Sequence, residues 1–219
     1  MAKRFLAIWF FHLTTDYLVR KRPELKDVAF ILAGPERGRM VVKAANDIAR
    51  SKGINTDMVV ADCRAILPSL KVIDDDVKTA GKVLSALAEW CMRYTPSVAI
   101  ELPDGLILDI SGCAHLWGGE EAYLKDILAR IRNYGYHIRA AIADTIGAAW
   151  AVSRYGQVTP IIEPGKHSEA LLSLPPAALR LEASIIARLD KLGLYQVRSF
   201  INMPRSGSTC STPGSPTAS

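Results

Sequence analysis

The chain has 219 residues, of which 49% are hydrophobic and 22% are charged. A chain of this length and composition can bury a sizeable core, in one or two domains, and is too apolar to be disordered throughout. No apolar run approaches the roughly 20 residues that span a bilayer, and the hydrophobic stretch near the N-terminus is too short for a signal peptide. The sequence therefore predicts a cytoplasmic protein with no membrane partner.

The formal net charge of +5 and the sequence pI near 9.1 favour a polyanionic partner such as nucleic acid. The four cysteines lie far apart and form no CxxC pair, and the four histidines have no partner at metal-ligand spacing. These spacings argue against a structural zinc site and fit reduced thiols in a reducing compartment. We expect Cys63, Cys91 and Cys113 to be core residues.

Hydrophobic patterning and turn residues predict the elements of the first half of the chain. They are a strand at 4–11, a helix at 14–22, strands at 28–32 and 39–43 with a turn at 34–38 between them, short helices at 44–53 and 62–67, and a strand at 71–73. The strongest helix follows at 74–94, with an acidic first turn and one apolar stripe that we expect to face the core. The stripe consists of Val77, Ala80, Val83, Leu84, Leu87, Trp90 and Cys91.

The second half begins with a predicted β-hairpin, 98–102 and 106–110, joined by the turn sequence Pro103-Asp104-Gly105. A helix at 120–134, a strand at 136–143 and an alanine-rich helix at 144–155 follow, and beyond residue 171 the pattern predicts helices at 182–192 and 197–203. Residues 205–219 offer no apolar side chain that could anchor a core, so we expect disorder there. The element order predicts an α+β fold, a sheet backed by helices.

The hairpin carries carboxylates, the ligands that two-metal nucleotidyl transfer requires from adjacent strands. Asp104 lies in the turn and Asp109 five residues later, an odd spacing that places the two side chains on opposite faces of a regular strand. A simple turn is the favoured interpretation of Asp104, with metal binding as the alternative. After Gly119, Glu120 and Glu121 are expected to complement a helix dipole, with an anion-binding nest as the alternative.

Four segments in a fixed order resemble the Y-family, or UmuC-type, translesion DNA polymerases, and within that family most closely the ImuB-like branch. They are FLAIWFFHLTTDYL, VVKAANDIARSKGINTDMVVADCRAILPSL, LILDISGCAHLWGGE and RAAIADTIGAAWAVSRYG. The resemblance covers nearly the whole chain to about Pro204. It implies a palm-like, ferredoxin-like polymerase sheet backed by helices. The implied division is a palm and fingers region at 1–165 with its fingers-like insertion at about 28–73, a helical thumb-like segment at 166–204, and a tail at 205–219.

Active members of this family hold metal ions on an aspartate of the first strand and on an Asp-Glu pair at the hairpin. The positions that match in this sequence are Phe10, with His12 where a second acidic residue follows, and then Asp104 and Gly105. A phenyl ring cannot bind magnesium. One carboxylate of the set, Asp104, therefore remains as a candidate metal ligand.

The resemblance also implies residues that contact nucleotide and DNA. The tyrosine and arginine that active members offer to a triphosphate fall on Asp47 and Arg50, so Arg50 is the candidate nucleotide-binding residue, and a lysine of a later helix falls on Ile146. The candidates for contact with the DNA backbone in the thumb-like segment are Arg188, Lys191 and Arg198, against the alternative of a solvated helix face.

The resemblance implies a protein of DNA repair and damage-induced (SOS) mutagenesis that is catalytically inactive, needs no cofactor and acts as a DNA-associated adaptor. The implied partners are DNA, a separate translesion polymerase, an ImuA/RecA-like protein and the sliding clamp. We expect the family's C-terminal interaction region to be missing, as after a truncation or a frame change. The alternative is an active DNA-directed DNA polymerase that binds Mg²⁺ through Asp16, Asp104 or Asp109, and a third interpretation is an α+β domain unrelated to DNA.

Overall fold

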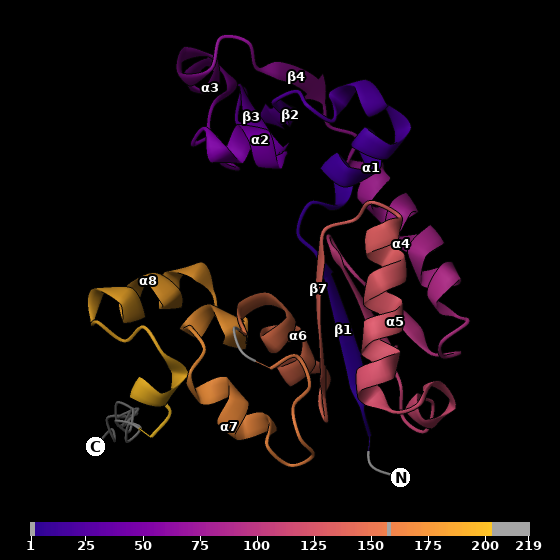
Figure 1. Cartoon of the computed structure of the whole chain (residues 1–219). Coiled ribbons are helices and arrows are strands. Elements are labelled where there is room, and N and C mark those ends of the chain that lie inside the picture. The colour runs from indigo at the N-terminus through magenta and orange to yellow at the C-terminus, as the bar shows by residue number, and fades with distance from the viewer. Residues whose placement is uncertain (1–2, 157–158, 203–219) are drawn as a thin grey trace, which may run out of the picture.

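The computed structural model describes residues 3–156 and 159–202 (Figure 1). Its strands are β1 (Phe5–Phe10), β2 (Phe30–Glu36), β3 (Arg39–Ala45), β4 (Lys71–Asp74), β5 (Val98–Glu101), β6 (Gly105–Asp109) and β7 (Ile138–Ala143). Its α-helices are α1 (Leu13–Lys21), α2 (Asp47–Ser51), α3 (Val60–Ile66), α4 (Val77–Cys91), α5 (Glu120–Asn133), α6 (Ile146–Tyr155), α7 (His167–Leu172) and α8 (Ala183–Lys191). Short 3-10 turns are η1 (Pro23–Leu25), η2 (Ala114–Trp117), η3 (Pro176–Leu179) and η4 (Val197–Ser199).

A four-stranded antiparallel sheet, in the order β5-β6-β1-β7, forms the centre of the fold. In the central strand β1, Trp9 lies opposite Gly105 of β6 and opposite Arg139 of β7. Successive side chains of a strand point to opposite faces, so Leu6 packs into one core and Ala7 into another. Helices α4 and α5 cover the first face, and α6 covers the second (Figure 1).

The apolar stripe predicted for α4 is largely confirmed. Val83, Leu84, Leu87 and Cys91 are buried in the core on the α4 face of the sheet. Val77 is 85% exposed, because it begins the helix beyond the edge of that core. The cysteine predictions are similarly mixed: Cys63 and Cys91 are buried, whereas Cys113 lies in a turn and is only half-buried.

A second sheet, in the order β3-β2-β4, carries α2 and α3 and has its own core (Figure 1). Two predictions for this part were inaccurate. Residues 34–35 lie within β2, and the chain reverses instead at Arg37 and Gly38, which have φ values of 48° and 77°. Helix α2 is shorter than predicted because Asn46 caps it, its Oδ1 accepting from the backbone N of Ala49 at 3.0 Å.

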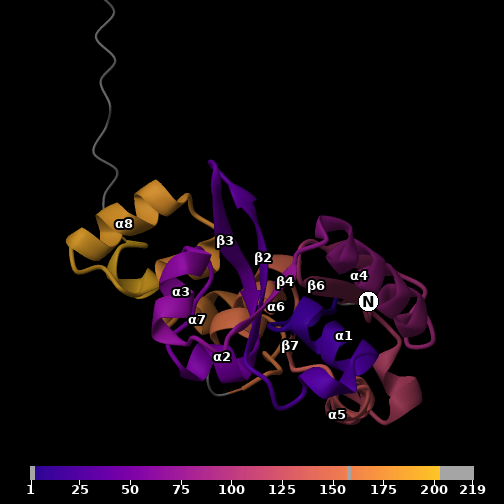
Figure 2. The same cartoon turned by 90° about the horizontal axis from the view of Figure 1, so that it is seen from above.

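The order of strands and helices from β1 to α6 is the order predicted from the sequence. Local sequence patterns do not predict α7, which packs against α6. Leu174 and Ala178, just beyond it, complete the core on that side. Helix α8 stands away from the sheet, and every residue in it keeps some exposed surface (Figure 2). The tail predicted at 205–219 lies outside the described residues. Among the residues described, none of the helices has the length and hydrophobicity that crossing a membrane requires.

Candidate functional site

A cleft of about 350 Å³ lies where the four-stranded sheet meets the β3-β2-β4 sheet. One side comes from the end of β1, the start of α1 and the hairpin turn, and the other from β3, α2 and the segment before α4. The lining includes Phe10, His12, Thr15, Lys43, Arg50, Asp75, Asp76 and Asp104. The structure thus brings together four residues singled out from the sequence, Phe10, His12, Arg50 and Asp104.

Phe10, at the position expected for a metal ligand, is a core residue. Its side chain is 1% exposed, and its ring packs edge-on against Tyr136 with 5.7 Å between the centroids. The backbone N of Phe10 donates to the carbonyl oxygen of Asp104 at 2.8 Å, which holds the hairpin turn beside the end of β1. The strand and the turn therefore lie side by side, but the ring of Phe10 is buried in the core on the α4 and α5 face, and the side chain of β1 that meets the Asp104 carboxylate is that of Trp9.

The carboxylate of Asp104 is bound by side chains from two other elements. Trp9 Nε1 donates to its Oδ2 at 2.9 Å, and the guanidinium of Arg154, in the last turn of α6, forms an ion pair with its Oδ1. The guanidinium carbon of Arg154 lies 5.5 Å from the ring centroid of Trp9 and 4.6 Å from that of Trp150. Burial lowers the pKa of Arg154, and the charge of Asp104 opposes that shift. Asp104 is therefore paired with a fixed cation.

Gly105, at the second position of the expected carboxylate pair, is packed closely against its neighbours. A Cβ atom at this position would lie 3.3 Å from the carbonyl oxygen of Ile8 and 3.3 Å from Cβ of Glu101. A glutamate at residue 105 would therefore press on Ile8 and Glu101, and these neighbours would have to give by a few tenths of an ångström.

The other carboxylates considered as substitute ligands do not converge on Asp104. Asp109 lies at the opposite end of β6, where its Oδ1 accepts from the backbone N of Ser111 at 3.0 Å. Asp16 accepts from the backbone N of His137 at 2.8 Å and contacts its Nδ1 at 3.0 Å. Within residues 3–156 and 159–202, no three His, Cys, Asp or Glu side chains are grouped so as to hold a metal ion. The residues of the cleft do not fit the pair of magnesium ions that nucleotidyl transfer requires.

His12 and Asp47 contact each other across the cleft. The distance from His12 Nε2 to Asp47 Oδ1 is 2.6 Å, and this contact joins the end of β1 to α2 of the second sheet. Burial lowers the pKa of His12, while the negative charges of Asp47 and Asp16 act in the opposite direction. Arg50, which follows Asp47 on α2, lines the same cleft. The candidate nucleotide-binding residue thus lies beside a contact that bridges the two sheets.

The comparison of Ile146 with a phosphate-binding lysine does not hold in the structure. Strand β7 is antiparallel to β1, and its last residue, Ala143, lies opposite Phe5. Helix α6 then returns along the sheet, so Ile146 begins the helix at the end far from the cleft, whereas Arg154 lies at the near end. Sequence reasoning missed Arg154 because Asp104 is 50 residues away in the chain and no local motif connects the two.

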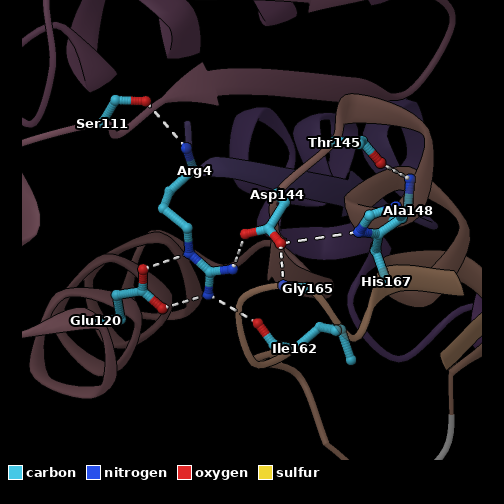
Figure 3. A network of polar contacts seen from close by, with 9 residues as sticks. All are labelled: Arg4, Ser111, Glu120, Asp144, Thr145, Ala148, Ile162, Gly165 and His167. Carbon is cyan, nitrogen blue, oxygen red and sulfur yellow. Dashed lines mark hydrogen bonds and ion pairs between the residues drawn. The ribbon is translucent and has the colours of Figure 1, made fainter. Parts of the chain in front are cut away.

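At the end of β1 opposite to the cleft, Arg4 forms hydrogen bonds with residues of four other segments (Figure 3). Its Nε donates to Oε1 of Glu120 at 2.6 Å, its Nη1 to Oδ1 of Asp144 at 2.7 Å and its Nη2 to the carbonyl of Ile162 at 2.8 Å. Its backbone N donates to Ser111 Oγ at 2.9 Å. Glu120 is therefore the ion-pair partner of a buried arginine, a role beyond the helix-dipole effect predicted from the sequence.

The candidate DNA-binding residues lie on the surface of the C-terminal helical part. Arg188 and Lys191 are exposed on α8, and Arg198 is exposed on η4 with its Nε donating to Oε1 of Gln196 at 2.6 Å. Helices α8, α2 and α3 lie on the same side of the four-stranded sheet (Figures 1 and 2). The exposed cations of α8 therefore lie on the side of the fold that carries the β3-β2-β4 sheet.

The profile of the impB/mucB/samB family matches residues 8–154, a span that contains the cleft and both strands of the hairpin. The chain belongs to the impB/mucB/samB family. It is similar to the protein ImuB of Caulobacter vibrioides (strain NA1000 / CB15N), with 45% identity over 153 residues, which are 70% of this chain and 33% of that protein. It is also similar to DNA polymerase IV of Marinomonas sp. (strain MWYL1), with 22% identity over 160 residues, which are 72% of this chain and 46% of that polymerase.

The fold of this family member is that of the Y-family polymerases. The insertion ternary complex of Dbh DNA polymerase superimposes with a TM-score of 0.74 at 14% identity, covering 92% of this chain and 61% of that chain. The α+β fold with a polymerase palm-like sheet, predicted from the sequence, is thereby confirmed. The chain spans about a third of the length of the ImuB protein that it matches.

Proposed function

We propose that this chain is a DNA-associated accessory protein of mutagenic DNA repair and that its cleft does not transfer nucleotides. The observation that carries this proposal is the pairing of Asp104 with Arg154. In two-metal catalysis, carboxylates of neighbouring strands hold cations that bind the triphosphate and activate the attacking hydroxyl. A guanidinium held by Asp104 supplies positive charge at the hairpin but has no open coordination position for either reacting oxygen.

Three further features of the cleft support the absence of nucleotide transfer. Phe10 places an apolar ring at the end of β1, and a Cβ atom at residue 105 would lie 3.3 Å from the carbonyl oxygen of Ile8, so a longer side chain there requires its neighbours to shift. The carboxylate of Asp47, on α2, touches His12 of the cleft, and a carboxylate at this place repels a triphosphate.

The DNA-associated part of the proposal rests on family membership and on charge. The matched relatives include proteins named as DNA polymerases, and the chain carries a net charge of +5. Exposed arginine and lysine side chains such as Arg188 and Lys191 are suited to contact phosphate oxygens without reading sequence. The adaptor role, linking a separate translesion polymerase, an ImuA/RecA-like protein and the sliding clamp, belongs to the same proposal and rests on the similarity to ImuB.

Primer extension by the purified chain, with Mg²⁺ or Mn²⁺, tests the catalytic part. We expect no incorporation by the wild-type chain or by the Asp104→Ala variant. Incorporation by the wild-type chain that Asp104→Ala abolishes would overturn the proposal in favour of an active DNA-directed DNA polymerase. Fluorescence anisotropy with a labelled primer-template tests the DNA part, and we expect binding that weakens with salt and persists in EDTA. Failure to bind at low salt would favour an α+β domain unrelated to DNA.

A further inference from the structure

A second groove, of about 470 Å³, lies between α1 and α4, and we call it the α1–α4 groove. Tyr17, Arg20 and Lys21 line it from α1, the face of α4 from Lys82 to Trp90 lines it from the other side, and Tyr134 and Tyr136 close one end. Helices α1 and α4 lie on the side of the molecule opposite to α8 (Figures 1 and 2). A molecule in this groove would therefore leave the exposed cations of α8 free.

The floor of the α1–α4 groove is apolar and is formed by side chains that also belong to the core. Val83 and Leu87 are buried there, and Trp90 is half-buried with its ring 5.5 Å from that of Tyr134. Tyr134 itself is 44% exposed. Tryptophan, tyrosine and arginine are the residues that dominate binding energy at protein interfaces. The groove therefore has the composition of a binding site for apolar side chains.

The rim of the α1–α4 groove is positively charged. Arg20, Lys21 and Lys82 are exposed there, and no aspartate or glutamate lines the groove in the part of the chain that the structure describes. The guanidinium of Arg20 is held in place, because its Nη1 donates to Tyr136 Oη at 2.8 Å and its carbon lies 4.9 Å from the centroid of that ring. An anchored cation at an apolar groove attracts a negatively charged group with little loss of side-chain entropy.

We propose that the α1–α4 groove binds an acidic amphipathic helix of a partner protein, with apolar side chains on Val83 and Leu87 and carboxylates at the cationic rim. A groove between two helices that presents an apolar floor fits the mode in which one face of a helix lies in a hydrophobic groove. Charge complementarity selects an acidic occupant. The C-terminal residues 203–219 contain no aspartate or glutamate and so do not match the rim.

The packing of the rings favours a protein partner over nucleic acid. Bases bind by stacking on open aromatic faces. In this groove the guanidinium of Arg20 covers the ring of Tyr136, that of Arg93 lies 4.6 Å from the ring centroid of Trp90, and the ring of Tyr134 meets Trp90 edge-on. The rings of Tyr136 and Trp90 therefore each carry a guanidinium on one face, and the floor beside them is aliphatic, which suits apolar side chains better than bases.

A display library of random 14-residue peptides, selected on the immobilised full chain, tests the proposal. We expect the selected peptides to carry apolar residues at helical spacing (i, i+3, i+4, i+7) and acidic residues between them. Their affinity, measured by fluorescence anisotropy, should fall about tenfold or more with Ala86→Glu, which places a charged side chain in the groove, and with the double variant Lys21→Glu/Lys82→Glu. Lys125→Glu, an exposed charge reversal on α5 outside this groove, is the matched control and should leave the affinity unchanged.

Several outcomes would overturn the proposal. They are selection of no peptide, selection of basic peptides, and selected peptides that bind wild type and the groove variants equally or that lose affinity with Lys125→Glu. A fluorescent single-stranded oligonucleotide serves as the competing probe, and its loss of binding with Ala86→Glu would assign the groove to nucleic acid. Circular dichroism of each variant checks that it remains folded, and the Lys21→Glu/Lys82→Glu variant keeps the test valid if Ala86→Glu unfolds. DNA binding through α8 is measured separately, so failure here leaves the proposed function standing.

Discussion

The imidazole of His12 touches the carboxylate of Asp47, with 2.6 Å between Nε2 and Oδ1. His12 follows β1 of the central sheet, whereas Asp47 begins α2 of the second sheet, so the contact connects the two sheets across the cleft. Both residues depart from the types expected in active members of the family. Together they form one interaction between the end of β1 and α2, beside the cleft.

Protonation of His12 gives the first prediction. Because burial lowers its pKa in the folded chain, the unfolded chain, with a histidine pKa of about 6.5, binds the proton more readily as the pH falls. The contribution of His12 to stability is therefore present above that pKa and is lost as the pH falls through the lower pKa of the folded state. Urea unfolding between about pH 7.5 and pH 5.5 should show stability falling with pH in the wild type and a shallower fall in His12→Gln.

Two other variants make this measurement specific. His115 is exposed and lies outside the cleft, so His115→Gln is the control. Asp47→Asn removes a charge that raises the pKa of His12 and should steepen the fall. Asp16 acts in the opposite sense, because burial raises its pKa. If His12→Gln steepens the fall, the contact with Asp47 outweighs burial and the prediction is wrong.

Arg4 gives a prediction about stability. Its side chain is 9% exposed and binds Glu120 and Asp144 at once, so Arg4→Met leaves two carboxylates without their cation. We expect a loss of about 3 kcal/mol in the free energy of unfolding, as for a broken buried ion pair. The neighbouring Lys3 is exposed, and Lys3→Met is the control, with an expected change within about 0.5 kcal/mol. Equal stability of the two variants in chemical denaturation would contradict the structural role of Arg4.

The pairing of Asp104 with Arg154 predicts both a stability change and an insensitivity to metal. Asp104→Asn leaves the partly buried guanidinium without its counter-charge, and we expect a loss of about 1–3 kcal/mol. Asp190→Asn, on the surface of α8, is the control.

A ligand that binds the folded state raises the melting temperature. Because the cleft does not fit magnesium, adding MgCl₂ should give the same melting temperature as NaCl of equal ionic strength, and a rise specific to Mg²⁺ that Asp104→Asn removes would refute the assignment.

The cations of α8 predict a specific change in DNA binding. If Arg188 and Lys191 each neutralise one phosphate, Arg188→Ala/Lys191→Ala should reduce the slope of log K against log salt concentration by about 2. Anisotropy titrations of a labelled primer-template at several NaCl concentrations measure this slope. The control is Lys26→Ala/Lys125→Ala, which removes the same number of exposed charges elsewhere. Equal slopes for the two double variants would place the DNA contacts away from α8.

The strands and helices of the first 155 residues could be predicted from local patterns because each has a strong signal of its own. Turn residues around Asp104 marked the hairpin, and the apolar stripe of α4 marked the helix face that packs on the sheet. Signals were weaker where a single side chain decides a boundary, as Asn46 does for α2, and where an element is short, as α7 is. Local patterns predict an element well when many of its residues favour the same secondary structure. They predict it poorly when one side-chain hydrogen bond sets where the element begins or ends.

The sequence by itself determined the family and the element order, and it predicted that Phe10 and Gly105 stand where active members carry carboxylates, because these depend on residue identity and spacing. Only the tertiary structure decided what takes their place. Arg154 reaches Asp104 from a helix 50 residues away, and Asp47 meets His12 from another sheet. Such pairs form where the fold brings distant segments together and burial requires each charge to find a partner, and no local pattern in the chain records them.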